Sequence, residues 1–148
     1  MSDRDALLNE SRRLSGMLIH LAEQAKADFA EAVAPFGLPV HLARAILMLE
    51  APAPMYQLAD SLACDRSYIT GLADKLEERG LVARVTGEDR RVKLLELTES
   101  GAKLRREVSD AVAERSMVLS RLTASERQAL EPLLLQLLGG IDPSDVSC

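Results

Sequence analysis

The residues best placed by type and spacing to do chemistry lie within residues 89–101, DRRVKLLELTESG. Asp89 precedes two adjacent arginines, Arg90 and Arg91, in a polar loop that begins at Gly87. A guanidinium carries five N–H donors in a rigid fork, which matches phosphate oxygens and the acceptor edges of bases. We therefore expect this loop to recognise nucleic acid rather than to make or break bonds.

Side chains that catalyse reactions or hold metal ions are few. The only imidazoles are His20 and His41, and the two cysteines, Cys64 and Cys148, lack metal-ligand spacing. We recognise no nucleophile–base pair and no phosphate loop, so we predict no enzymatic activity, no metal and no cofactor. Cys64 precedes a predicted helix and is interpreted as a small buried turn residue. The alternative is a redox sensor, because a helix N-terminus can lower a thiol pKa.

The composition predicts one compact, α-rich domain. The chain has 148 residues with two Phe, two Tyr and no Trp, so its core must be aliphatic. No apolar run approaches the roughly 20 residues that a membrane-spanning helix needs. Residues 1–13 are polar, unlike a secretory signal. We therefore expect a cytoplasmic protein that does not enter a membrane.

The charge is unevenly distributed. The net charge of the whole chain is −5, which argues at first against nucleic acid. Residues 64–106 hold ten Lys/Arg against eight Asp/Glu, a net of +2, and the rest of the chain is acidic. The basic excess is modest, but it coincides with the loop that carries the paired arginines.

The centre of the chain predicts two helices joined by a tight turn, followed by a hairpin. Asp65 suits the N-cap of the second helix and Gly80 its C-terminal end. The loop at residues 87–91 joins two alternating segments. This order is typical of a winged helix-turn-helix. The predicted elements are helices over residues 55–62 and 66–79 and strands over residues 81–86 and 92–97.

The flanks predict long amphipathic helices, with residues 51–54 as a rigid connector. Their broad apolar faces have little of their own domain to cover, so pairing with a second copy would bury them. We therefore predict a homodimer and a mostly α (α+β) fold. The predicted flanking helices span residues 3–34, 40–50, 98–122 and 124–138. The predicted regions are an N-terminal dimerisation helix (1–36), a DNA-binding winged helix-turn-helix (38–100) and C-terminal dimerisation helices (101–148).

Residues 58–101 resemble the DNA-binding half of the MarR family of transcriptional regulators. The matching segments are "LADSL", "ITGLADKLEERGLVAR" and "DRRVKLLELTESG". The order of the flanking helices fits as well, so the resemblance covers most of the chain. It implies a homodimer that binds double-stranded DNA at a palindromic operator, commonly as a repressor, and releases it when a small molecule binds.

The resemblance assigns roles to the polar residues. It implies that Arg91 enters the minor groove, and that Asp89 holds this arginine by a charge-assisted bond. The N-terminal turns of the recognition helix should reach the major groove, although Tyr68 could instead pack under the wing. The remaining candidates are phosphate contacts. The predicted DNA-binding residues are Arg66, Ser67, Tyr68, Thr70, Lys75, Arg84, Asp89, Arg90 and Arg91.

The family's effector pocket lies between the first, second and fifth helices. By that resemblance, apolar walls and a cation there would suit a small aromatic or phenolic ligand. The alternative is that these side chains are ordinary core or surface residues. The predicted effector residues are Met17, His20, His41, Arg44 and Met48.

A second interpretation stays open, in which the winged helix binds another protein instead of DNA. The modest local charge favours it. So does Gly71, which stands where many members of the family carry a bulkier polar or basic residue. Salt dependence separates the two interpretations, because DNA binding weakens steeply as salt rises.

Overall fold

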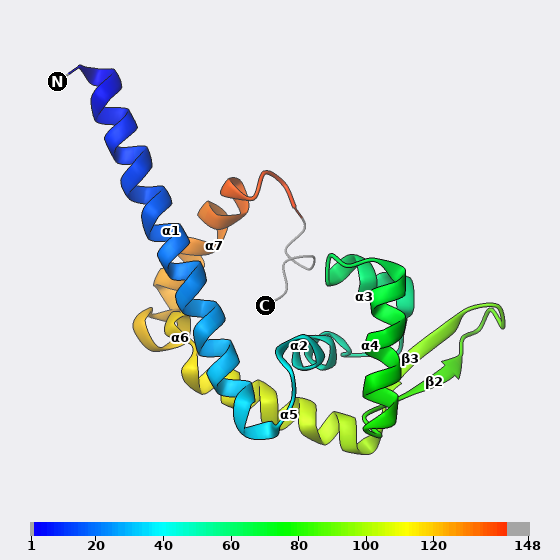
Figure 1. The fold of residues 1–148 in the computed structure, drawn as a ribbon. Helices are drawn as coiled ribbons and strands as arrows, with labels where there is room; N and C mark the ends of the chain where they lie inside the picture. Colours follow the sequence, from blue (N-terminus) through cyan, green and yellow to red (C-terminus); the bar gives the residue numbers. More distant parts are fainter. Residues whose placement is uncertain (1, 142–148) are drawn as a thin grey trace.

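The structure is a computed structural model that describes residues 2–141 of the chain (Figure 1). It is mostly helical with a small antiparallel sheet, which confirms the predicted fold class. The elements are α1 (Asp3–Val33), the 3-10 helix η1 (Ala34–Phe36), α2 (Val40–Met48), β1 (Ala53–Pro54), α3 (Met55–Ser61), α4 (Arg66–Glu78), β2 (Val82–Thr86), β3 (Lys93–Leu97), α5 (Glu99–Arg115), α6 (Met117–Arg121) and α7 (Ala124–Leu137).

The second helix of the helix-turn-helix, α4, is closed at both ends by the residues that the sequence indicated. The N–H of Tyr68 donates to Oδ1 of Asp65 at 2.7 Å, which caps the first turn. Gly80 takes a φ of +69°, and its N–H donates to the carbonyl of Glu77 at 2.9 Å. These two local signals therefore fix where α4 begins and ends.

One aliphatic core joins the end of α1 to α2, α3, α4, the sheet and α5. Within residues 2–141, every buried side chain is hydrophobic. Burial of each large aliphatic side chain contributes about 1.5–3 kcal/mol, so this cluster stabilises the central fold. The largest fully buried side chains are Val33, Leu42, Ile46, Leu49, Ile69, Leu76, Leu95 and Val108.

The sheet has the order β1-β3-β2 and is antiparallel throughout. The wing is the hairpin of β2 and β3, in which Thr86 pairs with Lys93. The expectation that residues 51–54 form only a connector was wrong, because Ala53 and Pro54 pair with β3 as a short edge strand. Proline fits an edge, where its missing N–H leaves no ladder bond unmade.

The helix expected over residues 98–122 is interrupted at Ser116, which corrects the sequence prediction. Ser116 has extended backbone angles, with φ −66° and ψ 115°. Its hydroxyl accepts a hydrogen bond from the N–H of Leu119 at 3.3 Å and so caps a new helix, α6. A serine hydroxyl offers the backbone this alternative to continuing the helix.

The start of α5 is held against the junction between α4 and β2. The hydroxyl of Thr98 donates to the carbonyl of Gly80 at 2.6 Å, and the N–H of Thr98 donates to the carbonyl of Leu81 at 3.0 Å. A Cβ added at Gly101 would lie 1.9 Å from that carbonyl oxygen of Leu81. Glycine is therefore required where α5 passes Leu81, the residue before β2.

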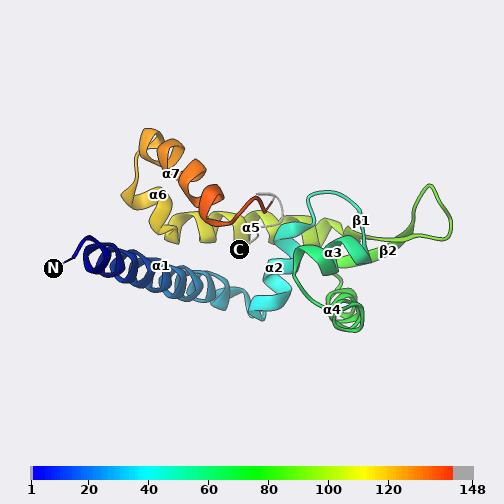
Figure 2. The same cartoon turned by 90° about the horizontal axis from the view of Figure 1, so that it is seen from above.

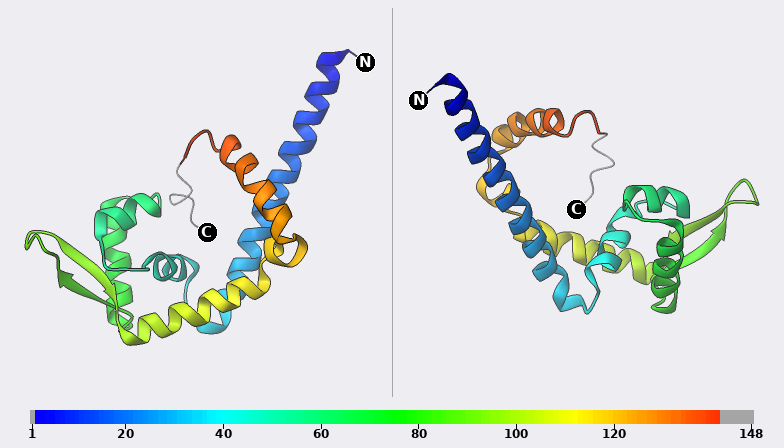
Figure 3. Two further views of the ribbon diagram at one scale, coloured as in Figure 1. Left: turned by 180° about the vertical axis from the view of Figure 1, so that it is seen from behind. Right: turned by 45° about the horizontal axis from the view of Figure 1, so that its top comes forward.

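The ends of the chain lie apart from the central core. Figure 2 shows α1 with α6 and α7 at one end of the molecule and the wing at the other, and the views in Figure 3 agree. No described residue of α6 or α7 is buried. The exposed large hydrophobic residues on these helices are Leu7, Leu8, Leu14, Met17, Leu18, Ile19, Leu21, Val118, Leu119, Leu133, Leu134 and Leu137.

Candidate nucleic-acid interface

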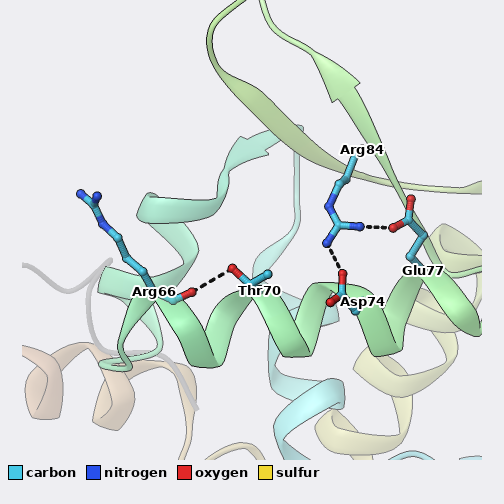
Figure 4. Close-up of polar contacts among 5 residues, drawn as sticks. All are labelled: Arg66, Thr70, Asp74, Glu77 and Arg84. Carbon is cyan, nitrogen blue, oxygen red and sulfur yellow. Dashed lines mark hydrogen bonds and ion pairs between the residues drawn. The ribbon is translucent and has the colours of Figure 1, made fainter.

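The N-terminal turns of α4 present the four polar residues that the sequence indicated, and all four are exposed. The hydroxyl of Ser67 donates to Asp65 at 2.7 Å. The hydroxyl of Thr70 donates to the carbonyl of Arg66 at 3.0 Å (Figure 4). Both hydroxyl protons are thus used within the helix, and the oxygens remain available as acceptors. The hydrogen bond from Ser67, followed by that from the N–H of Tyr68, lowers the pKa of Asp65 below its usual value.

The side chain of Tyr68 lies beside α2. Its ring centroid is 6.3 Å from that of His41, with the two planes tilted by 53°. Tyr68 nevertheless remains 47% exposed. The tyrosine therefore packs toward α2 rather than under the wing.

The wing tip is ordered by backbone hydrogen bonds. Oδ1 of Asp89 accepts from the main-chain N–H of Arg91 at 3.0 Å, and its carbonyl accepts from the N–H of Val92 at 2.9 Å. The expected charge-assisted bond to the Arg91 side chain is therefore replaced by one to its backbone. Over residues 2–141, neither Arg90 nor Arg91 makes an ion pair. Asp89 shapes the turn and leaves both guanidinium groups facing solvent.

Arg84 on β2 was expected to contact phosphate, but the structure directs it toward α4. Its guanidinium forms ion pairs with Asp74 and Glu77, both on α4 (Figure 4). The hydrogen bond to Asp74 contributes most to raising the pKa of Arg84. Arg84 therefore joins the wing to α4. Lys75, also on α4, is exposed near the helix C-terminus.

A hollow of about 330 Å³, which we call the wing–helix hollow, lies between α4 and the wing. It brings together Arg66, Thr70 and Arg91, three of the predicted DNA-binding residues. Tyr56 and Lys93 also line it, and sequence reasoning missed both. The predicted strand alternation gave no sign of the hollow. The other lining residues are Pro54, Met55, Ile69 and Val92.

A larger cavity of about 540 Å³, the helical pocket, lies between α1, α2, α5 and α6. Arg44 is the only one of the five predicted effector residues among its lining residues. Met17 and His20 lie on the exposed part of α1, while Met48 packs against the core. The structure thus does not bring the predicted effector set together. The lining residues are Ala25, Lys26, Asp28, Phe29, Val40, Arg44, Val112, Arg115, Ser116, Met117 and Val118.

Cys64 does not have the features of a reactive thiol. Burial, followed by the charge of Asp65, raises the pKa of the Cys64 thiol, whereas a redox sensor needs a lowered one. Cys148 lies outside the described residues. In the described part of the chain, no group of three or more His, Cys, Asp or Glu is arranged to hold a metal ion. No described helix combines the length and apolar character needed to cross a membrane.

Comparisons with known proteins agree with this geometry. Residues 46–93 match the MarR family. A MarR-family transcriptional regulator from Rhodococcus sp. RHA1 is 26% identical, with a TM-score of 0.74 over 86% of this chain and 94% of that one. CouR from Rhodococcus jostii RHA1, solved with p-coumaroyl-CoA bound, is 28% identical, with a TM-score of 0.73 over 86% and 92% of the two chains.

A mutant MarR from E. coli, solved in complex with operator DNA, is 25% identical, with a TM-score of 0.70 over 89% of this chain and 98% of that one. The helix-turn-helix, its wing and these likenesses define a DNA-binding transcriptional regulator of the winged-helix class. Residues 46–93 thus carry a MarR-family match, and most of the chain is similar in fold to MarR-family regulators.

Proposed function

We propose that the protein binds a palindromic operator as a homodimer and acts as a repressor that a small ligand releases. The observation that carries this proposal is that exposed cationic residues of α4 and of the wing line one hollow, Arg66 from α4 and Arg91 from the wing. The N-terminal turns of α4 would enter the major groove, and Arg91 would enter the adjacent minor groove. Arg90 and Lys75 would contact phosphates.

The experiment is selection of fragmented genomic DNA by the purified protein at moderate salt, beside the Arg91→Ala variant. We expect the wild-type protein alone to enrich a few palindromic fragments. Because Arg91 is exposed and unpaired within the described residues, the variant should fold normally. Equal enrichment by both proteins would remove the wing from the mechanism. Enrichment by neither would favour the interaction with another protein.

The homodimer is supported by the exposed apolar faces of α1, α6 and α7. Leu133 and Leu137 are 58% and 67% exposed on one face of α7, which is costly in water. A second copy would cover these faces symmetrically. The proposed dimerisation regions are residues 1–36 and 101–148, on either side of a DNA-binding region at residues 38–100. Sedimentation that gives only monomers at micromolar concentration would contradict this assembly.

The ligand proposal rests on the helical pocket. Phe29, Val112 and Met117 supply apolar walls, and the lining holds three cations against one carboxylate, Asp28. This chemistry fits a small aromatic or phenolic acid, with Arg44 nearest in role to the predicted effector set. CouR, which resembles this chain, was solved with an aromatic acyl-CoA. A ligand that binds one spacing of the two winged regions better would shift operator affinity.

The test is release of the bound operator by a panel of aromatic acids, with and without Arg44→Met. We expect at least one acid to release the operator from the wild-type protein, and the variant to need more of it. If every acid that releases the operator acts equally on both proteins, the ligand site lies elsewhere.

A further inference from the structure

The wing–helix hollow has a lining of one charge sign. Its charged residues are Arg66, Arg91 and Lys93, its hydroxyls come from Tyr56 and Thr70, and none of its described lining residues carries a carboxylate. The helical pocket, in contrast, includes Asp28 and apolar walls. A small cationic hollow that also offers the hydroxyl of Tyr56 as a donor suits a phosphate group, which presents anionic oxygens and no donor.

We propose that the wing–helix hollow seats one backbone phosphate of each operator half-site, with Lys93 and Tyr56 as positioning residues. This inference rests on the proposed operator binding and adds two residues and a single contact to it. Lys93 and Tyr56 lie outside the set that sequence reasoning selected.

The position of the hollow between α4 and the wing indicates that a phosphate would bind there. In a DNA duplex, a sugar–phosphate backbone runs between the major groove and the adjacent minor groove. A protein with α4 in one groove and its wing in the other must straddle that backbone. The hollow lies between these two elements, so a backbone phosphate is the group that would face it.

The lining side chains come from three separate parts of the fold, α3, α4 and the wing. Arg66 begins α4, Arg91 lies at the wing tip, Lys93 begins β3 and Tyr56 lies in the first turn of α3. Their agreement in charge and donor chemistry therefore does not arise from one helix face. A phosphate bound here would join the recognition helix to the wing.

The side chain of Lys93, which lines the hollow, is already held by one hydrogen bond. Its Nζ donates to the hydroxyl of Thr86 at 3.0 Å, across the pair that joins β2 and β3. An ammonium has three donors, so two remain for a phosphate. The bond to Thr86 also limits the rotamers of a long side chain, which reduces the entropy lost on binding.

The test uses an operator fragment from the genomic selection and measures binding by the wild-type protein, Lys93→Met, Tyr56→Phe and a control, Lys103→Met. The control removes the same charge from α5, where Lys103 is 72% exposed and lies outside the hollow. We expect Lys93→Met to raise the Kd roughly tenfold or more, because it loses a hydrogen bond to a charged group. The slope of log K against log salt should become shallower by about 0.9 for each copy bound, because one phosphate contact per copy is lost. Tyr56→Phe should give a smaller loss, and the control should match the wild type.

A second measurement locates the phosphate. Single methylphosphonate groups, which are neutral, are placed at each position of one half-site. We expect one position to weaken wild-type binding strongly and to have little further effect on Lys93→Met. If Lys93→Met behaves like Lys103→Met, or if its loss is the same at every position, the phosphate seat is wrong while operator binding stands. If the folded wild-type protein binds no duplex, both proposals fail.

Discussion

The winged helix-turn-helix and the terminal helices of this chain differ in how much of their apolar surface is buried within the chain. The central region buries its aliphatic residues within one chain, from Val33 to Val108. The N-terminal part of α1 and all of α6 and α7 leave comparable residues exposed. Both regions have amphipathic helices, so helical periodicity alone does not decide which one closes its own core. The difference teaches that the first region buries its apolar residues within its own chain, whereas the second leaves them exposed, which is why we propose a second copy to cover them.

The largest effect should come from charging the exposed face of α7. Leu133→Asp with Leu137→Asp would place carboxylates where the second copy should pack. Each leucine buried in an interface contributes about 1.5–3 kcal/mol, and a symmetric dimer counts each twice. We expect sedimentation to show dissociation to monomers and operator binding to weaken in parallel.

The control for this change is Gln136→Asp, which adds one carboxylate at an exposed polar position of α7. It should leave the dimer intact. If the double leucine variant still sediments as a dimer, this face of α7 does not pack against the second copy. That result would contradict the proposed difference between the central region and the terminal helices.

The next effect concerns two glycines within the central region. Gly101→Ala would push a Cβ to 1.9 Å from the carbonyl oxygen of Leu81, so we expect a loss of about 3 kcal/mol in the free energy of unfolding. Gly71→Ala meets nothing within 4 Å, and alanine favours a helix by about 1 kcal/mol, so it should stabilise the protein. Chemical denaturation measures both. If both variants change the free energy of unfolding in the same direction, the packing described for α5 is wrong.

A smaller effect should follow from separating the wing from α4. Arg84→Met removes the ion pairs to Asp74 and Glu77, and partly exposed pairs of this kind contribute up to about 1 kcal/mol. If Arg84 positions the wing, operator affinity should fall, and the loss caused by Arg91→Ala should be smaller in this background. A double-mutant cycle with operator DNA measures this coupling. If the losses in binding free energy caused by Arg84→Met and Arg91→Ala simply add, Arg84 has no role in positioning the wing.

The smallest effect is the pH dependence of the α4 cap. Hydrogen bonds from Ser67 and Tyr68 lower the pKa of Asp65 from its usual 3.8. A carboxylate with a lowered folded-state pKa stabilises the protein above the unfolded value and loses this contribution as pH falls through the folded value. Asp65→Asn keeps the acceptor but does not titrate. The difference in unfolding midpoint between the two proteins should therefore change only below about pH 4, and a change near neutrality would contradict this cause.

The central region was largely predictable because its signals are local. Asp65 and Gly80 fix the ends of α4 through bonds to neighbouring residues, and strand alternation predicted the wing. Both strands begin one residue later than predicted, at Val82 and Lys93, for a local reason as well. Leu81 donates to the carbonyl of Leu76 at the end of α4, and Val92 donates to Asp89 in the turn.

What the sequence missed depends on partners that are remote along the chain. The edge strand at Pro54 exists only because β3 lies beside it. The ion pairs of Arg84 require β2 to lie beside the turn of α4 that carries Asp74 and Glu77. At Ser116 the apolar spacing continued, so periodicity could not indicate a hydroxyl that caps a new helix. That break also placed Met117 in the helical pocket.

The central claim is that two copies, joined by the terminal helices, bind one palindromic duplex through the winged regions. The most direct measurement is sedimentation of the wild-type protein with a labelled operator fragment across a range of salt concentrations. We predict a complex of two chains per duplex. The logarithm of its association constant should fall linearly with the logarithm of the salt concentration. A complex of one chain per duplex, or binding indifferent to salt, would contradict the account.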